Sequence, residues 1–177
     1  MGIDHGGALP WPGGVHAALR RARVRHVAYV PDAGQAELIA LCAGDGAMGM
    51  VPLTTEEEGV ALLAGTWLGG ERGVLLMQSS GVGNCVNMFS LARACRFPLL
   101  MLVTMRGQWG EQNPWQVPMG QAVAGILRLS GALVFEVERS DAVAETVDAA
   151  AAMAFSGAAM AAVLISQRIV GAKAFPQ

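Results

Sequence analysis

Two hydrophobic patterns alternate along the chain. Short runs of consecutive apolar residues predict buried strands, and longer segments with apolar residues three or four positions apart predict helices. The predicted strands are 26–30, 48–53, 73–77, 99–104, 132–137 and 162–166, and the predicted helices are 13–21, 33–42, 55–68, 82–94, 121–130 and 141–155. Continuous apolar strands separated by helices indicate a parallel sheet covered on both faces. We therefore expect an α/β fold, doubly wound, with about six strands.

Length and composition point to one domain that associates with other chains. The 177 residues fit a single domain over 1–177, with a core at about 13–170. Apolar residues make up 53% and charged residues 15%, fewer charges than the roughly 25% of an average domain. So few charges in so small a domain suggest apolar surface that is covered in an oligomer. The uncharged segment Ala149–Ser166 is long enough to suggest a membrane span. Because Ser156 and Gly157 interrupt it and a β-branched run ends it, we predict a buried helix and a buried strand, and no membrane.

Charge and cysteine content exclude several classes of function. The net charge is −2, and Lys173 is the single lysine, so nucleic-acid binding is not expected. An arginine cluster at 20–25 is interpreted as the solvated side of the first helix. The three cysteines have no metal-binding spacing, and we expect buried, reduced thiols in a cytoplasmic protein. The N-terminus lacks the basic and apolar regions of a signal peptide.

Ligands of doubly wound sheets bind beyond the carboxyl ends of the strands, here the loops after Val30, Leu53, Met77 and Thr104. Three motifs are set aside. The triplet 44–46, Gly-Asp-Gly, has no asparagine 25 to 30 residues later and is interpreted as a turn. The stretch 81–83 lacks the third glycine of a dinucleotide fingerprint. Ser80 lacks the glycine two residues before it that a hydrolase nucleophile requires.

The segment 54–59 carries the strongest chemical signal. Its sequence is Thr-Thr-Glu-Glu-Glu-Gly, and it leads into an apolar helix. Thr55 and Glu58 can form a capping box, which leaves Glu56 and Glu57 without a structural duty. Glu56 shares a helical stripe with apolar residues, so its carboxylate is expected to be partly desolvated. From the residues alone, a functional role and a purely structural one are equally open.

Three motifs in order resemble a known family. The first is Glu56 followed nine residues later by Gly65; the second is 75–84, Leu-Leu-Met-Gln-Ser-Ser-Gly-Val-Gly-Asn; the third is the loop 106–120, beginning Arg-Gly-Gln-Trp-Gly-Glu-Gln-Asn-Pro. Together with Val-Pro-Asp at 30–32, they are similar to the pyrimidine-binding domain of thiamine-diphosphate-dependent enzymes. The sulfopyruvate decarboxylase α subunit and the phosphonopyruvate decarboxylases resemble the chain most, over about residues 13–170.

The resemblance implies roles for particular residues. Glu56 would hydrogen-bond the ring nitrogen N1′ of the cofactor and promote its imino tautomer, and Glu57 is the fallback if the register slips. The residues that would lie beside thiamine diphosphate are Pro31, Gln78, Ser79, Ser80 and Asn84. Capping of the helix that starts near Val82 would explain the last four residues equally well. Arg106 would bind a sulfonate or phosphonate of the substrate, and a plain surface arginine is the alternative.

The resemblance also implies a partner. The chain lacks the motif that binds magnesium and pyrophosphate, so a separate β subunit would supply Mg2+ and the diphosphate contacts. Self-association is expected as well, and the tryptophans Trp109 and Trp115 are candidate interface anchors. The function expected is a split decarboxylase acting on a 2-oxo acid. A non-catalytic homo-oligomer and an unrelated flavodoxin-like nucleotide binder remain alternatives.

Overall fold

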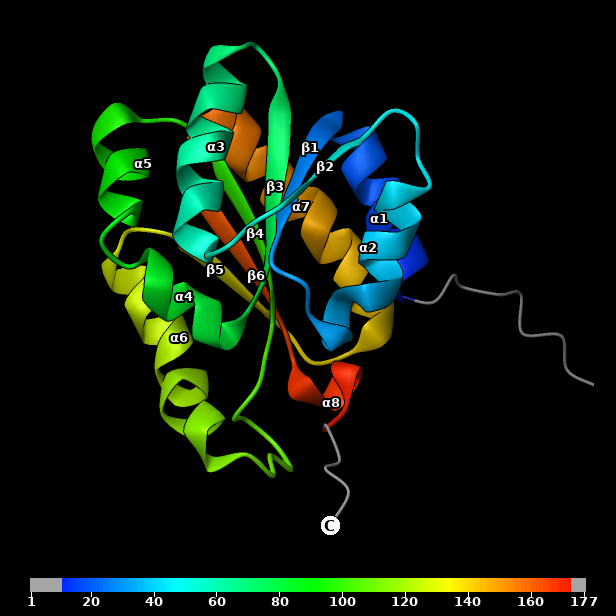
Figure 1. The fold of residues 1–177 in the computed structure, drawn as a ribbon, viewed down its shortest axis with the longest axis vertical. Coiled ribbons are helices and arrows are strands. Elements are labelled where there is room, and N and C mark those ends of the chain that lie inside the picture. The colour runs from blue at the N-terminus through cyan, green and yellow to red at the C-terminus, as the bar shows by residue number, and fades with distance from the viewer. Residues whose placement is uncertain (1–10, 173–177) are drawn as a thin grey trace, which may run out of the picture.

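Six parallel strands form one sheet in the computed structural model, which describes residues 11–172 (Figure 1). The order across the sheet is β2-β1-β3-β4-β6-β5. The strands are β1 Val24–Tyr29, β2 Gly49–Pro52, β3 Arg72–Gln78, β4 Leu99–Thr104, β5 Leu133–Val137 and β6 Met160–Ile165. The expected α/β, doubly wound sheet is thus confirmed.

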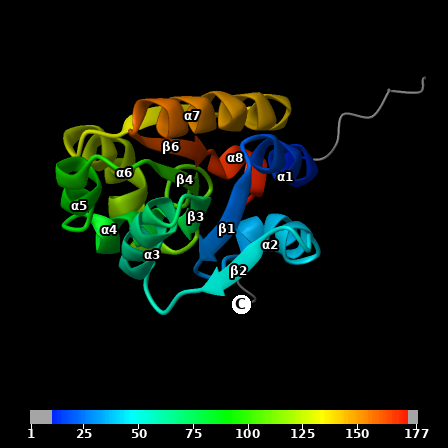
Figure 2. The ribbon, with the colours of Figure 1, turned by 90° about the horizontal axis from the view of Figure 1, so that it is seen from above.

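Helices cover both faces of the sheet, as the view from above shows (Figure 2). One face carries α1 Trp11–Arg21, α2 Ala36–Ala43 and α7 Val143–Gly157. The other carries α3 Glu56–Leu68, α4 Ser79–Cys85, α5 Phe89–Cys95 and α6 Val117–Leu129. A short helix, α8 Gln167–Val170, follows the last strand.

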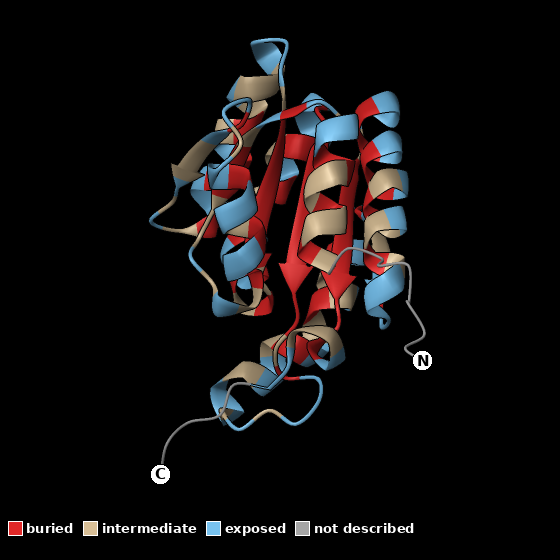
Figure 3. Ribbon diagram, turned by 90° about the vertical axis from the view of Figure 1, so that its right-hand side faces the viewer, coloured by how far each residue is buried: buried red, intermediate tan, exposed pale blue. Residues whose placement is uncertain are grey.

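The central strands are buried on both sides, which explains their unbroken apolar sequence (Figure 3). All six residues of β4 and of β6 are buried. Because successive side chains of a strand point to opposite faces, Leu100 and Leu102 pack into the core beneath α1 and α7, whereas Met101 and Val103 pack beneath α3 to α6. The sheet therefore separates two hydrophobic cores.

Several predicted helix boundaries were wrong. The predicted helix 82–94 is two helices, because α4 begins directly after β3 at Ser79 and ends at Cys85, and α5 begins after a turn at 86–88. The predicted helix 121–130 begins earlier, at Val117, because Pro118 fits a first helical turn. The 3-10 helices at 33–35 and 140–142 stand at the starts of the predicted helices 33–42 and 141–155, whereas the 3-10 helix at 114–116 and α8 were not predicted.

The uncharged segment 149–166 forms the second half of α7 and then β6, as predicted. Within residues 11–172, no helix combines the length and apolarity that crossing a membrane requires.

The prediction of three buried thiols was correct for two of them. Cys42 and Cys85 are buried, and their burial raises the pKa of Cys42 to about 11 and that of Cys85 to about 12. Cys95, the last residue of α5, is exposed.

Candidate functional site

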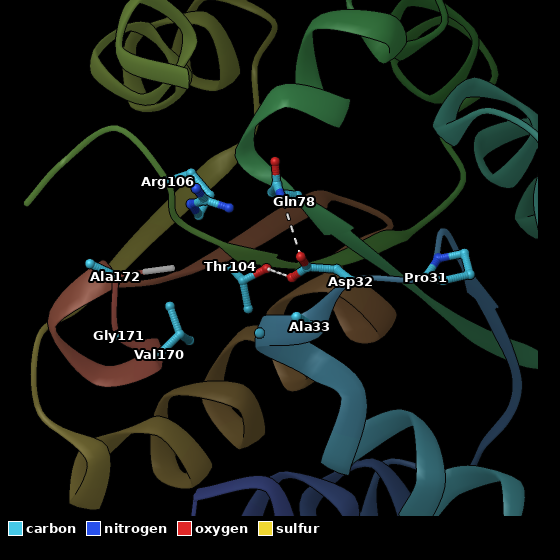
Figure 4. Close-up of a pocket in the computed structure, with 10 residues that line it drawn as sticks. Pro31, Asp32, Ala33, Gln78, Thr104, Arg106, Val170, Gly171 and Ala172 are labelled. Atoms are coloured by element: carbon cyan, nitrogen blue, oxygen red, sulfur yellow. Dashed lines mark hydrogen bonds between the residues drawn. The ribbon is translucent and has the colours of Figure 1, made fainter. Parts of the chain in front are cut away.

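A cavity of about 330 Å³ lies at the carboxyl ends of β1, β3 and β4, against the end of α8 (Figure 4). This is the edge of the sheet where the strand pattern predicted a ligand site. The lining residues come from the loop after β1, the last residue of β3, the end of β4 and the segment after α8: Pro31–Gly34, Gln78, Thr104, Arg106 and Val170–Ala172. Of the lining residues in the described part of the chain, two carry acidic or basic side chains, Asp32 and Arg106.

Hydrogen bonds fix the carboxylate of Asp32 on one side of this cavity. Gln78 Nε2 donates to Asp32 Oδ1 at 3.0 Å, and Thr104 Oγ1 donates to Asp32 Oδ2 at 2.7 Å. Ser80 Oγ donates to Gln78 Oε1 at 2.9 Å, so the Gln78 amide is held at both ends. Beneath them, the buried Gln35 donates from Nε2 to the carbonyl oxygens of residues 77 and 102. The loop after β1 is thereby bonded to the ends of β3 and β4.

The other charged group of the cavity, Arg106, is paired with Glu111. Arg106 Nε and Nη2 each donate to one carboxylate oxygen at 2.7 Å, and the two side chains are only 12% and 3% exposed. Glu111 also accepts from the backbone N–H groups of Gly107 and Asn113 and from Gln167 Nε2. The hydrogen bond from Arg106, followed by these other donors, lowers the pKa of Glu111 to about 2. The pKa of Arg106 is raised by Glu111 and, more weakly, by Asp32.

This ion pair should make the chain sensitive to acid. The folded-state pKa of Glu111, about 2, lies below its ordinary value of 4.5, so its stabilisation is present above about pH 4.5 and is lost as the pH falls toward 2. We expect the difference in unfolding free energy between wild type and Glu111→Gln to shrink by about 1–3 kcal/mol over this range. Urea unfolding at a series of pH values measures it. A difference that stays constant with pH would contradict the assignment.

Glu56 lies apart from the cavity, at the first residue of α3. Its side chain is buried, and the residue is 8% exposed. Asn84 Nδ2 donates to Glu56 Oε2 at 2.7 Å, whereas Oε1 makes no hydrogen bond within residues 11–172. Gly81 faces the carboxyl group, and a Cβ at this position would overlap it. The expected desolvation of Glu56 is confirmed, and α4 is shaped to accommodate its carboxylate.

The neighbouring acidic residues behave differently. Glu57, the fallback residue, is exposed. The predicted capping box is wrong in detail: Thr55 is the N-cap but its side chain makes no capping hydrogen bond, and Glu58 bonds the backbone N–H of Thr54 at 2.9 Å. Glu58 therefore closes the turn before the helix, and of the three glutamates Glu56 alone is buried.

The sequence-predicted residues fall into two groups on either side of α4. Pro31, Gln78 and Arg106 line the cavity, and Ser80 bonds Gln78. Glu56 and Asn84 form the second group. The predicted residue Ser79 belongs to neither group: it is fully buried, and its hydroxyl oxygen accepts from the backbone N–H of Arg106 at 3.0 Å.

Sequence reasoning missed the four residues Asp32, Thr104, Glu111 and Gln167. Asp32 and Thr104 had a usable signal, since each is a polar residue at the end of a predicted strand. Glu111 lies within the motif 106–120, but neither it nor Gln167 had a signal for its partners, which are set only by the fold. Within residues 11–172 no group of three or more His, Cys, Asp or Glu side chains is arranged to hold a metal ion.

The fold resembles that of a solved 2-oxoglutarate:ferredoxin oxidoreductase from Magnetococcus marinus. The two superpose with a TM-score of 0.74 over 92% of this chain and 29% of that chain, at 16% sequence identity. No protein-family model matches the sequence.

Sequence relatives are more specific. The sulfopyruvate decarboxylase subunit alpha of Methanothermobacter thermautotrophicus is 38% identical over 116 residues, which cover 65% of this chain and 70% of that protein. The protein of the same name from Methanocaldococcus jannaschii is 34% identical over 64% of this chain and 68% of its own length. A phosphonopyruvate decarboxylase of Streptomyces viridochromogenes is 36% identical over 64% of this chain, but only 29% of that longer protein is covered. With the matching motifs and the parallel sheet already described, these similarities show that the chain belongs to the sulfopyruvate decarboxylase subunit alpha family.

Proposed function

We propose that the chain, residues 1–177, is the pyrimidine-binding α subunit of a two-subunit decarboxylase that depends on thiamine diphosphate. Its substrate would be a 2-oxo acid with a sulfonate or phosphonate at the far end. The observation that carries this proposal is the buried carboxylate of Glu56, which accepts a hydrogen bond on one oxygen and, among the residues that the structure describes, none on the other. The names of the relatives supply the reaction class, the decarboxylation of sulfopyruvate or phosphonopyruvate.

The surroundings of Glu56 fit an aminopyrimidine ring. Asn84 occupies Oε2 and fixes the orientation of the carboxyl group, so Oε1 can hold a proton at ring nitrogen N1′. Gly81 leaves the space that the carboxyl group needs, and the apolar stripe of α3 at Val60 and Leu63 limits its hydration. Thiamine diphosphate, when bound, would supply the carbanion and the electron sink for loss of carbon dioxide. The chain itself would control the protonation of the ring and orient it.

The pocket side chains fit a substrate and the edge of the cofactor. Gln78 and Ser80 form a fixed polar edge between the cavity and Glu56. Pro31 lines the wall of the cavity beside Asp32. Arg106 supplies the positive charge for an anionic group of the substrate.

A partner subunit would complete the site. Two of the relatives just described are named as subunit alpha, and the chain has several exposed large apolar side chains. Leu68 at the end of α3 is 87% exposed, and Trp115 in the loop before α6 is 83% exposed. Exposed apolar and aromatic side chains of this size are suited to contacts in a subunit interface. We assign these surfaces to a β subunit, which would bring Mg2+ and the diphosphate contacts, and to a second copy of the chain.

The test is coexpression with the β subunit, followed by a screen of 2-oxo acids for release of carbon dioxide. Activity is expected only when both subunits, thiamine diphosphate and Mg2+ are present. A complex that binds the cofactor but decarboxylates none of the acids would favour the non-catalytic homo-oligomer or scaffold. Calorimetry that detects no cofactor binding, with or without the partner, would favour an unrelated nucleotide binder.

A further inference from the structure

We propose that Glu111 and Gln167 are positioning residues for Arg106. They hold its guanidinium so that the edge formed by Nη1 and Nη2 faces the cavity and can bind the terminal oxyanion of the substrate. This inference rests on the proposed function and adds its recognition element. The oxyanion is a sulfonate or a phosphonate, whose charged oxygens have the same tetrahedral arrangement.

The geometry of the ion pair determines which side of Arg106 is available. Glu111 takes the side-on edge of the guanidinium, formed by Nε and Nη2, with two bonds of 2.7 Å. Nη1 makes no hydrogen bond within residues 11–172. The end-on edge, formed by Nη1 and the second N–H of Nη2, is thus left for a ligand (Figure 4). Two parallel N–H donors on that edge match two oxygens of a sulfonate or phosphonate.

Gln167, the first residue of α8, supports the ion pair between Arg106 and Glu111. Gln167 is fully buried, its Nε2 donates to Glu111 at 3.0 Å, and its Oε1 accepts from the backbone N–H groups of Gln108 and Trp109, each at 3.0 Å. Gln108 Oε1 in turn accepts from the backbone N–H of Gln167. Such a network fixes the guanidinium before the ligand arrives, which lowers the entropic cost of binding.

The charges of the cavity determine which end the anion occupies. Asp32 is an anion with both oxygens already bonded, so it repels an oxyanion and offers it no donor. Among the lining residues within 11–172, only Arg106 has a cationic side chain. A substrate with two negative ends would therefore place one of them at Arg106, away from Asp32.

The experiment uses the α–β complex with thiamine diphosphate and Mg2+, and three non-reactive acids as probes. The acids are 3-sulfopropanoate, 3-phosphonopropanoate and butanoate, and calorimetry gives the Kd of each. In Arg106→Ala, the Kd of the first two is expected to rise about 10- to 100-fold, as for loss of a charge-assisted hydrogen bond, with butanoate unchanged. Whichever oxyanion loses more identifies the preferred one.

The positioning role has its own variants. Glu111→Gln should raise the same two Kd values by a smaller factor, and Arg106→Lys should restore only part of the binding, because an ammonium lacks the planar edge. Arg128→Ala is the matched control, since Arg128 is an exposed arginine that pairs with Glu136 and does not line the cavity. KM values for sulfopyruvate, phosphonopyruvate and pyruvate should follow the same order, with kcat less affected.

Three results would overturn the inference. The first is an equal loss of affinity for all three acids in Arg106→Ala, and the second is the absence of binding of either oxyanion to the wild-type complex. The third is a loss of oxyanion affinity in Arg106→Ala without any loss in Glu111→Gln, which would remove the positioning role. Failure of the proposed function would differ, because the complex would then turn over no 2-oxo acid even if the two oxyanions bound as expected.

Discussion

Glu56→Gln is expected to lower the kcat of the α–β complex by about two to four orders of magnitude, the range that general acid–base groups supply. The amide is close in size to the carboxyl group, so the contacts with Asn84 and Gly81 need little adjustment. An amide cannot hold an exchangeable acidic proton at the ring nitrogen, and tautomer control is lost. Steady-state kinetics of the purified complex measures the effect.

The matched control is Glu57→Gln, one position along the same helical turn. Glu57 is exposed, whereas Glu56 is buried, so the same chemical change at Glu57 should leave kcat within about twofold. Melting temperatures should agree among wild type and both variants. Nearly wild-type turnover in Glu56→Gln, or equal losses at both positions, would remove Glu56 from its proposed role.

Gly120→Ala is expected to destabilise the chain by about 3 kcal/mol or more, above the usual range for overpacking, since the obstruction is backbone. A Cβ at Gly120 would overlap the carbonyl oxygen of Arg106 and would lie 2.8 Å from the Cα of Gly107. Neither atom can move away without shifting the loop that holds Arg106. The free energy of unfolding in urea, measured on the same complex, gives the size of the effect.

Gly125→Ala provides the comparison within the same helix, α6. No atom lies within 4 Å of a Cβ built at Gly125, and alanine favours the helical conformation. This variant should be neutral or gain up to about 1 kcal/mol. If both alanine variants had the same stability, the close approach of α6 to the loop would be refuted.

The sheet could be predicted because its strands obey a simple rule. In β4, residues 99–103 each face one of two apolar layers, so the run Leu-Leu-Met-Leu-Val marks both the element and its burial, and the predicted bounds 99–104 match. The break between α4 and α5 could not be predicted in the same way. Residues 86–88 continue the helical pattern of polarity and contain no glycine or proline, so no turn residue marks the break.

The candidate site was predictable where one element determines it and unpredictable where several do. The position of Glu56 follows from its place at the start of an apolar helix, and its burial was expected on that ground. The pairing of Arg106 with Glu111 spans a loop of irregular conformation, with positive φ at residues 107 and 110. No periodicity constrains such a loop, so the partner of Arg106 emerged only from the fold.

A single short helix, α4, separates the two groups of polar residues. Gln78 at its N-terminus bonds Asp32 on the cavity side, and Gly81 and Asn84 contact Glu56 on the other side. A rigid rotation or shift of these seven residues would displace both groups together. Paired substitutions on opposite sides of α4, such as one at Asp32 and one at Glu56, should therefore change the free energy of unfolding by an amount that differs from the sum of the single changes. This is expected even though the two side chains make no direct contact.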